Sequence, residues 1–343
     1  MSENNRTLII AADSKNYGSY QIFAALLARQ MENQKENYML LESYTAQDIM
    51  KAKNYNPTNV IGFNSNLPLM KINDMCGPDF FGAPFENFLL DHPLYHHKKL
   101  IGSFRQRVHC VDKDHVDYVK RYYPNIEEVI QSPMPPFKGT GANVEYDSKK
   151  DRIIFCGTFD EPDRFLKVID DLPEELRKIS LSLIDEMTDR MAHADSSFNY
   201  AKTYEEVFLL KLQESELAKE KDCRNRIPEY MHQCFAAEAY LRFRKRNQVM
   251  ARLIEENFPM DVYTDSGLFK ECGKVRIKPA ITYFEYLNKC GRYKYNLHID
   301  TGFELGVHDR EINAAINGTT LINARMYMSN DEIVELVKEK MKI

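Results

Sequence analysis

The chain alternates short apolar runs with longer helix-like segments, and this alternation constrains its fold most strongly. In the first part of the 343-residue sequence, apolar and β-branched runs predict short buried strands. These strands are predicted at residues 7–12, 38–41, 59–62, 87–90, 108–111 and 129–131. Helical or looped segments separate them, beginning with a helix over residues 21–34. Strands joined by such crossovers form parallel sheets with helices on both faces, so the pattern predicts an α/β fold.

A second series of strands and helices follows a proline- and glycine-rich break at residues 132–141, which we interpret as an interdomain linker. Further strands are predicted at 152–156, 260–264, 275–277, 295–299 and 320–322. Helices are predicted at 164–170, 174–192, 204–219, 228–257, 282–290 and 331–341. We therefore expect two Rossmann-like parallel-sheet domains facing across a cleft. They would span residues 1–140 and 141–328, with a C-terminal helix at 329–343 that could cross back to the first domain.

Composition argues against several classes of protein. The formal net charge of −5 gives no general attraction to nucleic acid or to an anionic membrane. No apolar run is long enough for a membrane span, and the polar N-terminus does not resemble a signal peptide. The seven cysteines are scattered without a CxxC pair, which indicates reduced thiols rather than a disulfide framework or a zinc site. We therefore expect a cytoplasmic protein.

The segment 296–324 carries the densest group of candidate binding residues. It reads as a strand, a glycine-bearing loop, a helix ended by Gly318, and a second strand. Asp309 is expected to cap the helix. A helix N-terminus suits phosphate, and a neighbouring carboxylate can bind sugar hydroxyls. The candidate residues of this segment are Glu304, Gly306, His308, Arg310 and Glu311. The alternative interpretation is a solvated first helical turn.

A second group of candidates follows the predicted strand at 152–156. Gly157 and Thr158 could present backbone N–H groups and a hydroxyl to a diphosphate, because ligands bind beyond the carboxyl ends of parallel strands. Arg164 is the next cation and could reach the same phosphates. A simple tight turn and a surface arginine are the structural alternatives.

Candidates in the first domain also lie beyond predicted strand ends. Asp91 and His92 follow the strand at 87–90, where His92 would be a general base oriented by Asp91. Tyr17 and Gly18 lie in the first strand–helix loop and are acceptor-side candidates. Ordinary turn roles remain open for all four residues. Asp112, Lys113 and Asp114 form a DxD pattern, but an N-cap explains it better than a metal site.

The ordered set of motifs resembles the GT-B glycosyltransferases, most closely the CgeB-like (spore maturation protein) family. The resemblance covers most of the chain. It is carried by FLLDHPLYH at 88–96, VHCVDKDHVDYVKRYYPNI at 108–126, RIIFCGTF at 152–159, RNQVMARLIEENFPMDVYTDSG at 246–267 and GVHDREINAAING at 306–318. In the last block Arg310 and Glu311 are adjacent, which departs from the family's Arg–x–x–Glu–Ala-type helix start.

The resemblance implies a nucleotide-sugar donor site in the second domain and an acceptor site in the first. The expected activity is metal-independent transfer of a hexosyl or related sugar, with a UDP-sugar as donor and no further cofactor. The acceptor would be a glycan, a protein or a small molecule. Two alternatives stay open at this point. One is a GT-B-like epimerase or hydrolase, and the other is a catalytically silent sugar-nucleotide sensor or partner subunit.

Overall fold

The computed structural model describes residues 5–13, 16–102, 105–299 and 302–343. The chain divides into two compact units, each of which is described by itself. The first unit comprises Met1–Pro135 together with Thr282–Phe284, and the second comprises Pro136–Ile281 and Glu285–Ile343. The division falls within the proline-rich segment at 132–141. Among the described residues, no helix has the length and apolar character needed to cross a membrane.

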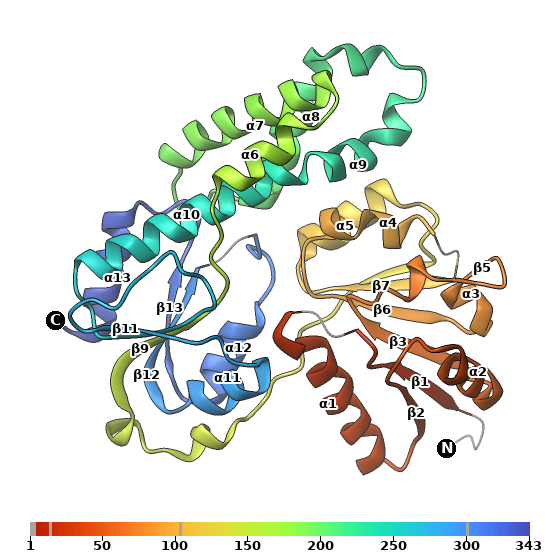
Figure 1. The fold of residues 1–343 in the computed structure, drawn as a ribbon, viewed down its shortest axis with the longest axis horizontal. Coiled ribbons are helices and arrows are strands. Elements are labelled where there is room, and N and C mark those ends of the chain that lie inside the picture. Colours follow the sequence, from red (N-terminus) through yellow and green to blue (C-terminus); the bar gives the residue numbers. More distant parts are fainter. Residues whose placement is uncertain (1–4, 14–15, 103–104, 300–301) are drawn as a thin grey trace. The chain divides into compact units, whose positions relative to one another are not determined.

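The first unit is built on a six-stranded parallel sheet (Figure 1) with the strand order β2-β1-β3-β6-β7-β8. Its strands are β1 (Arg6–Ile10), β2 (Asn37–Leu41), β3 (Asn59–Phe63), β6 (Phe85–Leu89), β7 (Gln106–Cys110) and β8 (Glu128–Gln131). Its helices are α1 (Ser19–Asn33), α2 (Ala46–Tyr55), α3 (Gly77–Phe81), α4 (His97–Leu100) and α5 (Lys113–Tyr122). A short hairpin of β4 (Lys71–Ile72) and β5 (Met75–Cys76) was not predicted from the sequence.

Burial explains why these short segments are strands. Leu8, Ile10, Val60 and Phe85 belong to one apolar cluster in the first unit. Fully burying one such side chain contributes about 1.5–3 kcal/mol, so a few strands supply most of the driving force for this core. Strand order reverses direction between β1 and β3. In an open parallel sheet, such a reversal opens a crevice at the carboxyl ends of the two strands.

The second unit contains a five-stranded parallel sheet with the order β11-β10-β9-β12-β13. Its strands are β9 (Lys150–Cys156), β10 (Met260–Tyr263), β11 (Val275–Lys278), β12 (Tyr293–Ile299) and β13 (Thr320–Ala324). Three helices follow strands of this sheet: α11 (Tyr283–Cys290), α12 (Asp309–Ile316) and α13 (Asn330–Met341). The α/β class with parallel sheets is thus confirmed. Here the order reverses between β9 and β12.

The apolar face of the final helix, α13, packs within the second unit. Ile333, Val334 and Val337 are buried in the same cluster as strand residues Ile153 and Leu297. A Ser329–Glu332 capping box begins the helix. Its apolar face therefore has a partner in the second unit.

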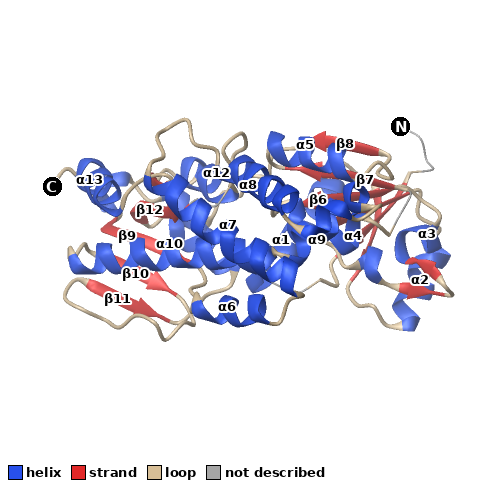
Figure 2. Ribbon diagram, turned by 90° about the horizontal axis from the view of Figure 1, so that it is seen from above, coloured by secondary structure: helices blue, strands red, loops and turns tan. Residues whose placement is uncertain are grey.

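Helices α6 (Asp163–Asp170), α7 (Glu174–Ala192), α8 (Tyr200–Glu214), α9 (Cys223–Gln233) and α10 (Phe235–Glu255) connect β9 to β10. In Figures 1 and 2, α10 lies alongside α7. The prediction of one helix over 228–257 is wrong, because the chain breaks at Cys234. That residue has φ −83° and ψ 10°, and its carbonyl accepts a hydrogen bond from Tyr204 Oη at 3.2 Å.

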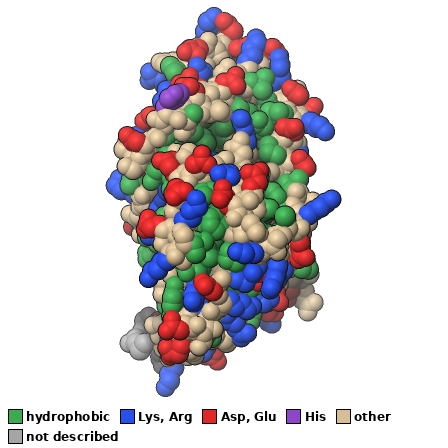
Figure 3. All heavy atoms as spheres, turned by 90° about the vertical axis from the view of Figure 1, so that its left-hand side faces the viewer, with side chains coloured by type: hydrophobic (Ala, Val, Ile, Leu, Met, Phe, Trp, Pro, Cys, Tyr) green, Lys and Arg blue, Asp and Glu red, His purple; other side chains and the backbone are tan. Residues whose placement is uncertain are grey.

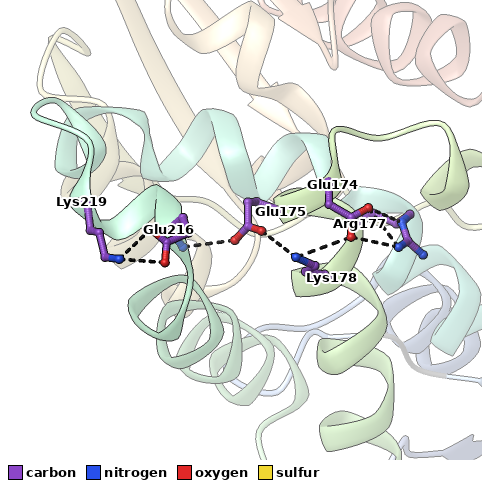
Figure 4. A network of polar contacts seen from close by, with 6 residues as sticks. All are labelled: Glu174, Glu175, Arg177, Lys178, Glu216 and Lys219. Carbon is purple, nitrogen blue, oxygen red and sulfur yellow. Dashed lines mark hydrogen bonds and ion pairs between the residues drawn. The ribbon is translucent and has the colours of Figure 1, made fainter.

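An exposed network of ion pairs joins the start of α7 to the turn that follows α8 (Figure 4). Arg177 and Lys178 pair with Glu174, and Lys178 also pairs with Glu175 at 3.0 Å. Glu175 then accepts a hydrogen bond from the backbone N–H of Glu216. Exposed pairs of this kind are screened by salt, so the network adds little to the free energy of unfolding. Its main effect is to orient the turn after α8.

Candidate functional site

The carboxyl ends of β9, β12 and β13 meet where the strand order of the second sheet reverses. Arg310, in the first turn of α12, donates from Nη2 to the carbonyl of Cys156, the last residue of β9, at 2.8 Å. Gly157 follows, and a Cβ added there would lie 2.8 Å from the Phe155 ring and 3.7 Å from Arg310 Nη2. The absence of a side chain at Gly157 therefore leaves the strand end open beside Arg310.

Two further arginines belong to the same strand ends, and the sequence analysis missed both. Arg246 comes from α10, is only 9% exposed, and donates from Nη1 to the carbonyl of Thr158 at 3.0 Å. Arg325 directly follows β13. Arg325 could have been predicted from the sequence, because it lies one residue beyond a buried strand. Arg246 has no such signal, because its helix is brought to the site only by tertiary packing.

His298 near the end of β12 lies among these cations. The pKa of His298 is held well below its usual value, first by burial, then by His308, and then by Arg310, Arg246 and Arg325. Its Nδ1 lies 3.5 Å from Arg310 Nη1, and its ring stacks on the His308 ring with centroids 4.4 Å apart. Since a guanidinium can only donate, Nδ1 accepts and the neutral ring carries its proton on Nε2. His298 thus orients Arg310 without adding charge.

The start of α12 differs by one residue from the sequence prediction. His308, not Asp309, occupies the N-cap position, because His308 has extended backbone with φ −66° and ψ 151°. His308 Nδ1 accepts from the Arg310 backbone N–H at 3.3 Å, and the carboxylate of Asp309 lies beside it. Gly318, with φ +59°, ends the helix as predicted.

The far end of α12 is fixed by the segment that enters the second unit. The Asn317 side chain is fully buried, donates to the Phe137 carbonyl at 2.9 Å, and accepts from the Gly139 N–H at 2.8 Å. Lys149 Nζ donates to the carbonyls of Asn317 and Gly318 at the helix C-terminus. A cation there favours the helix dipole, so α12 is held rigidly with its N-terminus at the strand ends.

Gly157, Thr158, His308 and Arg310 are thus brought together by the structure, whereas other predicted donor residues have separate contacts. Arg164 is 65% exposed and pairs with Asp160 at 2.9 Å. Glu304 Oε1 accepts from the Tyr200 backbone N–H at 3.0 Å, which places it at the start of α8. Gly306 lies in the connection between β12 and α12, of which residues 300 and 301 are outside the described part.

Two hollows adjoin this group of residues. A cavity of about 330 Å³ is lined by Glu304, Arg325 and the loop before α8, including Ser197 and Asn199. A wider, shallow groove of about 760 Å³ runs along α12, where Glu311 is the one charged residue among mainly apolar neighbours such as Val307 and Ile316. Carboxylates and hydroxyls beside Arg325 suit a polar, hydroxylated ligand in the first cavity.

In the first unit, the crevice between β1 and β3 also carries a polar cluster. Buried Asp13 accepts from Tyr44 Oη at 2.8 Å and from Asn66 Nδ2 at 2.8 Å. Asn64, one residue beyond β3, donates to Asp91 Oδ2 at 2.7 Å. The sequence analysis did not select Asp13 or Asn64, although both lie just beyond predicted strands.

The predicted base His92 lies at the start of a short helical turn. Its Nδ1 accepts from the Leu94 backbone N–H at 3.1 Å, so the neutral ring carries its proton on Nε2. Burial, followed by the charges of His115 and His96, holds the pKa of His92 well below its usual value. This arrangement presents a hydrogen-bond donor at Nε2. The catalytic role predicted for Asp91 and His92 stays a prediction.

The other first-unit candidates are local backbone features. Tyr17 has φ 56° and Gly18 has φ 78°, so both take the left-handed conformation at the start of α1. Tyr17 is exposed. In the DxD pattern, Asp112 caps α5 by accepting from the Asp114 N–H at 2.7 Å, as predicted. Over the described ranges, His, Cys, Asp and Glu side chains form no group of three or more suited to a metal ion.

Two depressed histidine pKa values make stability depend on pH. In the folded chain the pKa of His92 and that of His298 lie well below the ordinary histidine value of 6.5. Below about pH 6.5 the unfolded chain binds these protons first, so stability falls as the pH falls, by up to about 1.4 kcal/mol per pH unit for each histidine. We expect the melting temperature to drop from pH 7.5 to pH 5.5, and His298→Gln to reduce that drop. Thermal unfolding of the wild type and of His298→Gln, recorded side by side at both pH values, measures the difference.

Gly157 gives a prediction about close packing at the site. The Phe155 ring that a new Cβ would meet is fully buried and stacked on Phe159, so it has little room to move. Gly157→Ala is expected to lower the free energy of unfolding of the second unit by about 1–3 kcal/mol. Denaturant titration measures this loss. Gly267→Ala is the matched control, because no atom lies within 4 Å of a Cβ added there.

No protein-family model matches this chain, and no curated protein matches it.

Proposed function

We propose that the chain is a glycosyltransferase that moves a sugar from a nucleotide-sugar donor to an acceptor, without requiring a metal. The observation that carries the proposal is the group of Arg246, Arg310 and Arg325 around the β9–β12 reversal. Two of the three are anchored to strand-end carbonyls. A diphosphate is the common ligand that needs several fixed cations and helix amides at such a position.

The chemistry required is stabilisation of a leaving nucleoside diphosphate. Negative charge develops on the diphosphate as the bond to the sugar breaks, and prepositioned guanidinium groups stabilise that charge without reorganising. The first backbone N–H groups of α12 would add to this stabilisation of negative charge. The hydroxylated sugar would occupy the cavity beside Glu304 and Arg325. Glu311, which lines the separate groove along α12, is a further proposed acceptor for ligand hydroxyl groups.

The first unit would hold the acceptor. We propose that Asp91, together with His92, binds the acceptor hydroxyl and that a carboxylate of this unit receives its proton. Asp13 is a second candidate for that role because it is buried next to Tyr44 and Asn66. A UDP-sugar is the proposed donor, and cytoplasm the proposed location.

The test is binding and turnover with a panel of nucleotide sugars and free nucleoside diphosphates. A ligand that binds only the folded state raises the melting temperature. We expect a selective shift that survives EDTA and is lost in Arg310→Ala. Absence of a shift with every donor at millimolar concentration would refute the proposal.

A second candidate, a sugar-nucleotide sensor without transfer activity, is favoured by one observation. His92 Nδ1 is occupied by the Leu94 N–H, so His92 is not arranged as a base. Release of nucleoside diphosphate in the presence of acceptor mixtures separates the two candidates. A sensor would bind the donor but release no diphosphate.

A further inference from the structure

A further cavity in the second unit contains a buried lysine and shares Met326 and Tyr327 with the cavity beside Glu304 and Arg325. It is about 540 Å³ and is bounded by the end of α7, the middle of α10 and residues 326–332, which lead from β13 into α13. This volume is in the range of small-molecule sites in proteins. Figures 1 and 2 show α7 and α10, which form two of its walls.

Lys245 is the central residue of this cavity. Its side chain is 8% exposed, and its Nζ donates to the carbonyl of Met328. In the described part of the chain, no carboxylate lies within ion-pair distance of Lys245 Nζ. Burial lowers the pKa of Lys245 to about 8, while the charge of Glu332 opposes this shift. A buried cation without a carboxylate partner is costly, and an anionic ligand would remove that cost.

The rest of the lining strengthens the preference for an anion. Arg244 is half-buried beside Lys245 and packs over the Tyr240 ring. The N-terminus of α13 adds the positive end of its dipole. The one acidic side chain in the lining is Glu332, whose Oε2 accepts from the Ser329 N–H at 2.6 Å. Arg244 and Lys245 are cations and Glu332 is an anion, so the cavity lining has a net charge of about +1, which suits a monoanion.

Other lining atoms indicate the rest of the ligand. Among the described residues, Thr188 Oγ1 and Asn330 Oδ1 are buried side-chain atoms without a hydrogen-bond partner, and both residues line the cavity. Such atoms need a polar partner. The remaining wall contains the adaptable side chains of Met191, Met326 and Met328. Thioethers pack well against aromatic or other apolar groups.

We propose that this cavity binds a small hydroxy acid, whose carboxylate lies at Lys245 and Arg244. The ligand's apolar body contacts the methionines, and its hydroxyl bonds to Thr188 or Asn330. The site adjoins the cavity proposed for the sugar, because Met326 and Tyr327 line both, but the cations of α10 at the two sites bond to different segments. Arg246 bonds to Thr158, whereas Lys245 bonds to Met328. The proposal does not depend on the glycosyltransferase assignment.

Figure 3 shows one face of the molecule, on which acidic, basic and hydrophobic side chains all occur and basic side chains gather in the lower part. A cation buried inside a cavity acts more strongly on an anion than an exposed one does, because the dielectric is lower there.

The test uses the three isomers of hydroxybenzoate as probes and the matching hydroxybenzamides as neutral isosteres. The full-length protein carries ¹³C-labelled methionine methyl groups. We expect at least one hydroxybenzoate to shift the Met191, Met326 and Met328 signals, and its amide to bind about tenfold more weakly or worse, as expected for loss of a charged hydrogen bond. Saturating UDP should leave the shifts of Met191 and Met328 unchanged, since neither residue lines the cavity beside Glu304 and Arg325.

Lys245→Met should weaken hydroxybenzoate binding about tenfold or more and leave binding of the amide unchanged, for the same reason. Arg244→Gln, at a less buried position, is the second variant and should weaken the acid alone. The proposal is overturned if no isomer shifts the three methionines at millimolar concentration, or if acid and amide bind equally well. The proposal is also refuted if Lys245→Met or Arg244→Gln binds hydroxybenzoate as tightly as the wild type does.

Discussion

Replacing Arg310 by alanine is expected to lower the affinity for a nucleoside diphosphate about 100-fold. A hydrogen bond to a charged group is worth about 1.5–3 kcal/mol, and Arg310 can offer more than one such bond to a phosphate. Its guanidinium is held in place by the Cys156 carbonyl and by neutral His298, so little rotamer entropy is lost on binding. Isothermal titration with UDP measures the change.

Three variants make this experiment specific. Arg310→Lys keeps the charge but loses the planar fork, so it should give an intermediate affinity. Arg164→Ala tests the residue that the sequence suggested, and its exposed pair with Asp160 predicts little effect. Arg252→Ala removes a half-buried arginine near the end of α10 that pairs with Glu256, and it is the control for loss of a cation elsewhere on the second unit. Equal losses for Arg310→Ala and Arg252→Ala would mean that Arg310 does not contact the ligand.

The sequence was sufficient for the strands of the two parallel sheets, because buried strands have a local signature. Runs such as LII in β1 and IIF in β9 are apolar throughout, as strands covered on both faces must be. Helix limits were less accurate where tertiary contacts decide them. At the break, the Cys234 carbonyl accepts a hydrogen bond from Tyr204, which lies on another helix. No feature of the sequence near Cys234 predicts that bond.

The candidate site likewise contains some residues that the sequence identifies and others that only tertiary packing brings to the site. Gly157 and Arg310 lie next to strand and helix ends, so position along the chain identified them. Arg246 lies inside a long helix within a basic stretch, which reads as a solvated face. Its burial becomes visible only when α10 packs beside β9. Glu304 was also identified by its position in a loop, and the structure adds a contact that the sequence does not show, since one of its oxygens accepts from the Tyr200 N–H at the start of α8.

Asn317→Ala is expected to lower the free energy of unfolding of the second unit by about 2–5 kcal/mol. The Asn317 side chain makes three hydrogen bonds: it donates to the carbonyls of Phe137 and Asn313 and accepts from the Gly139 N–H. Alanine leaves buried Phe137 and Gly139 groups without this partner, and each such group costs about 1–3 kcal/mol. Denaturant titration measures the loss, and Asn225→Ala, in an exposed part of α9, is the control for the same change of side chain.

Asn317→Asp separates hydrogen bonding from packing. Aspartate keeps the size of asparagine but places an oxygen where Nδ2 now donates to the two carbonyls. Buried negative charge facing acceptors is less favourable than an empty space, so Asp should destabilise the unit more than Ala does. If Ala is the more damaging change, then volume rather than hydrogen bonding fixes this end of α12. Because α12 positions Arg310 at its other end, both variants should also weaken UDP binding, in the order of their effects on stability.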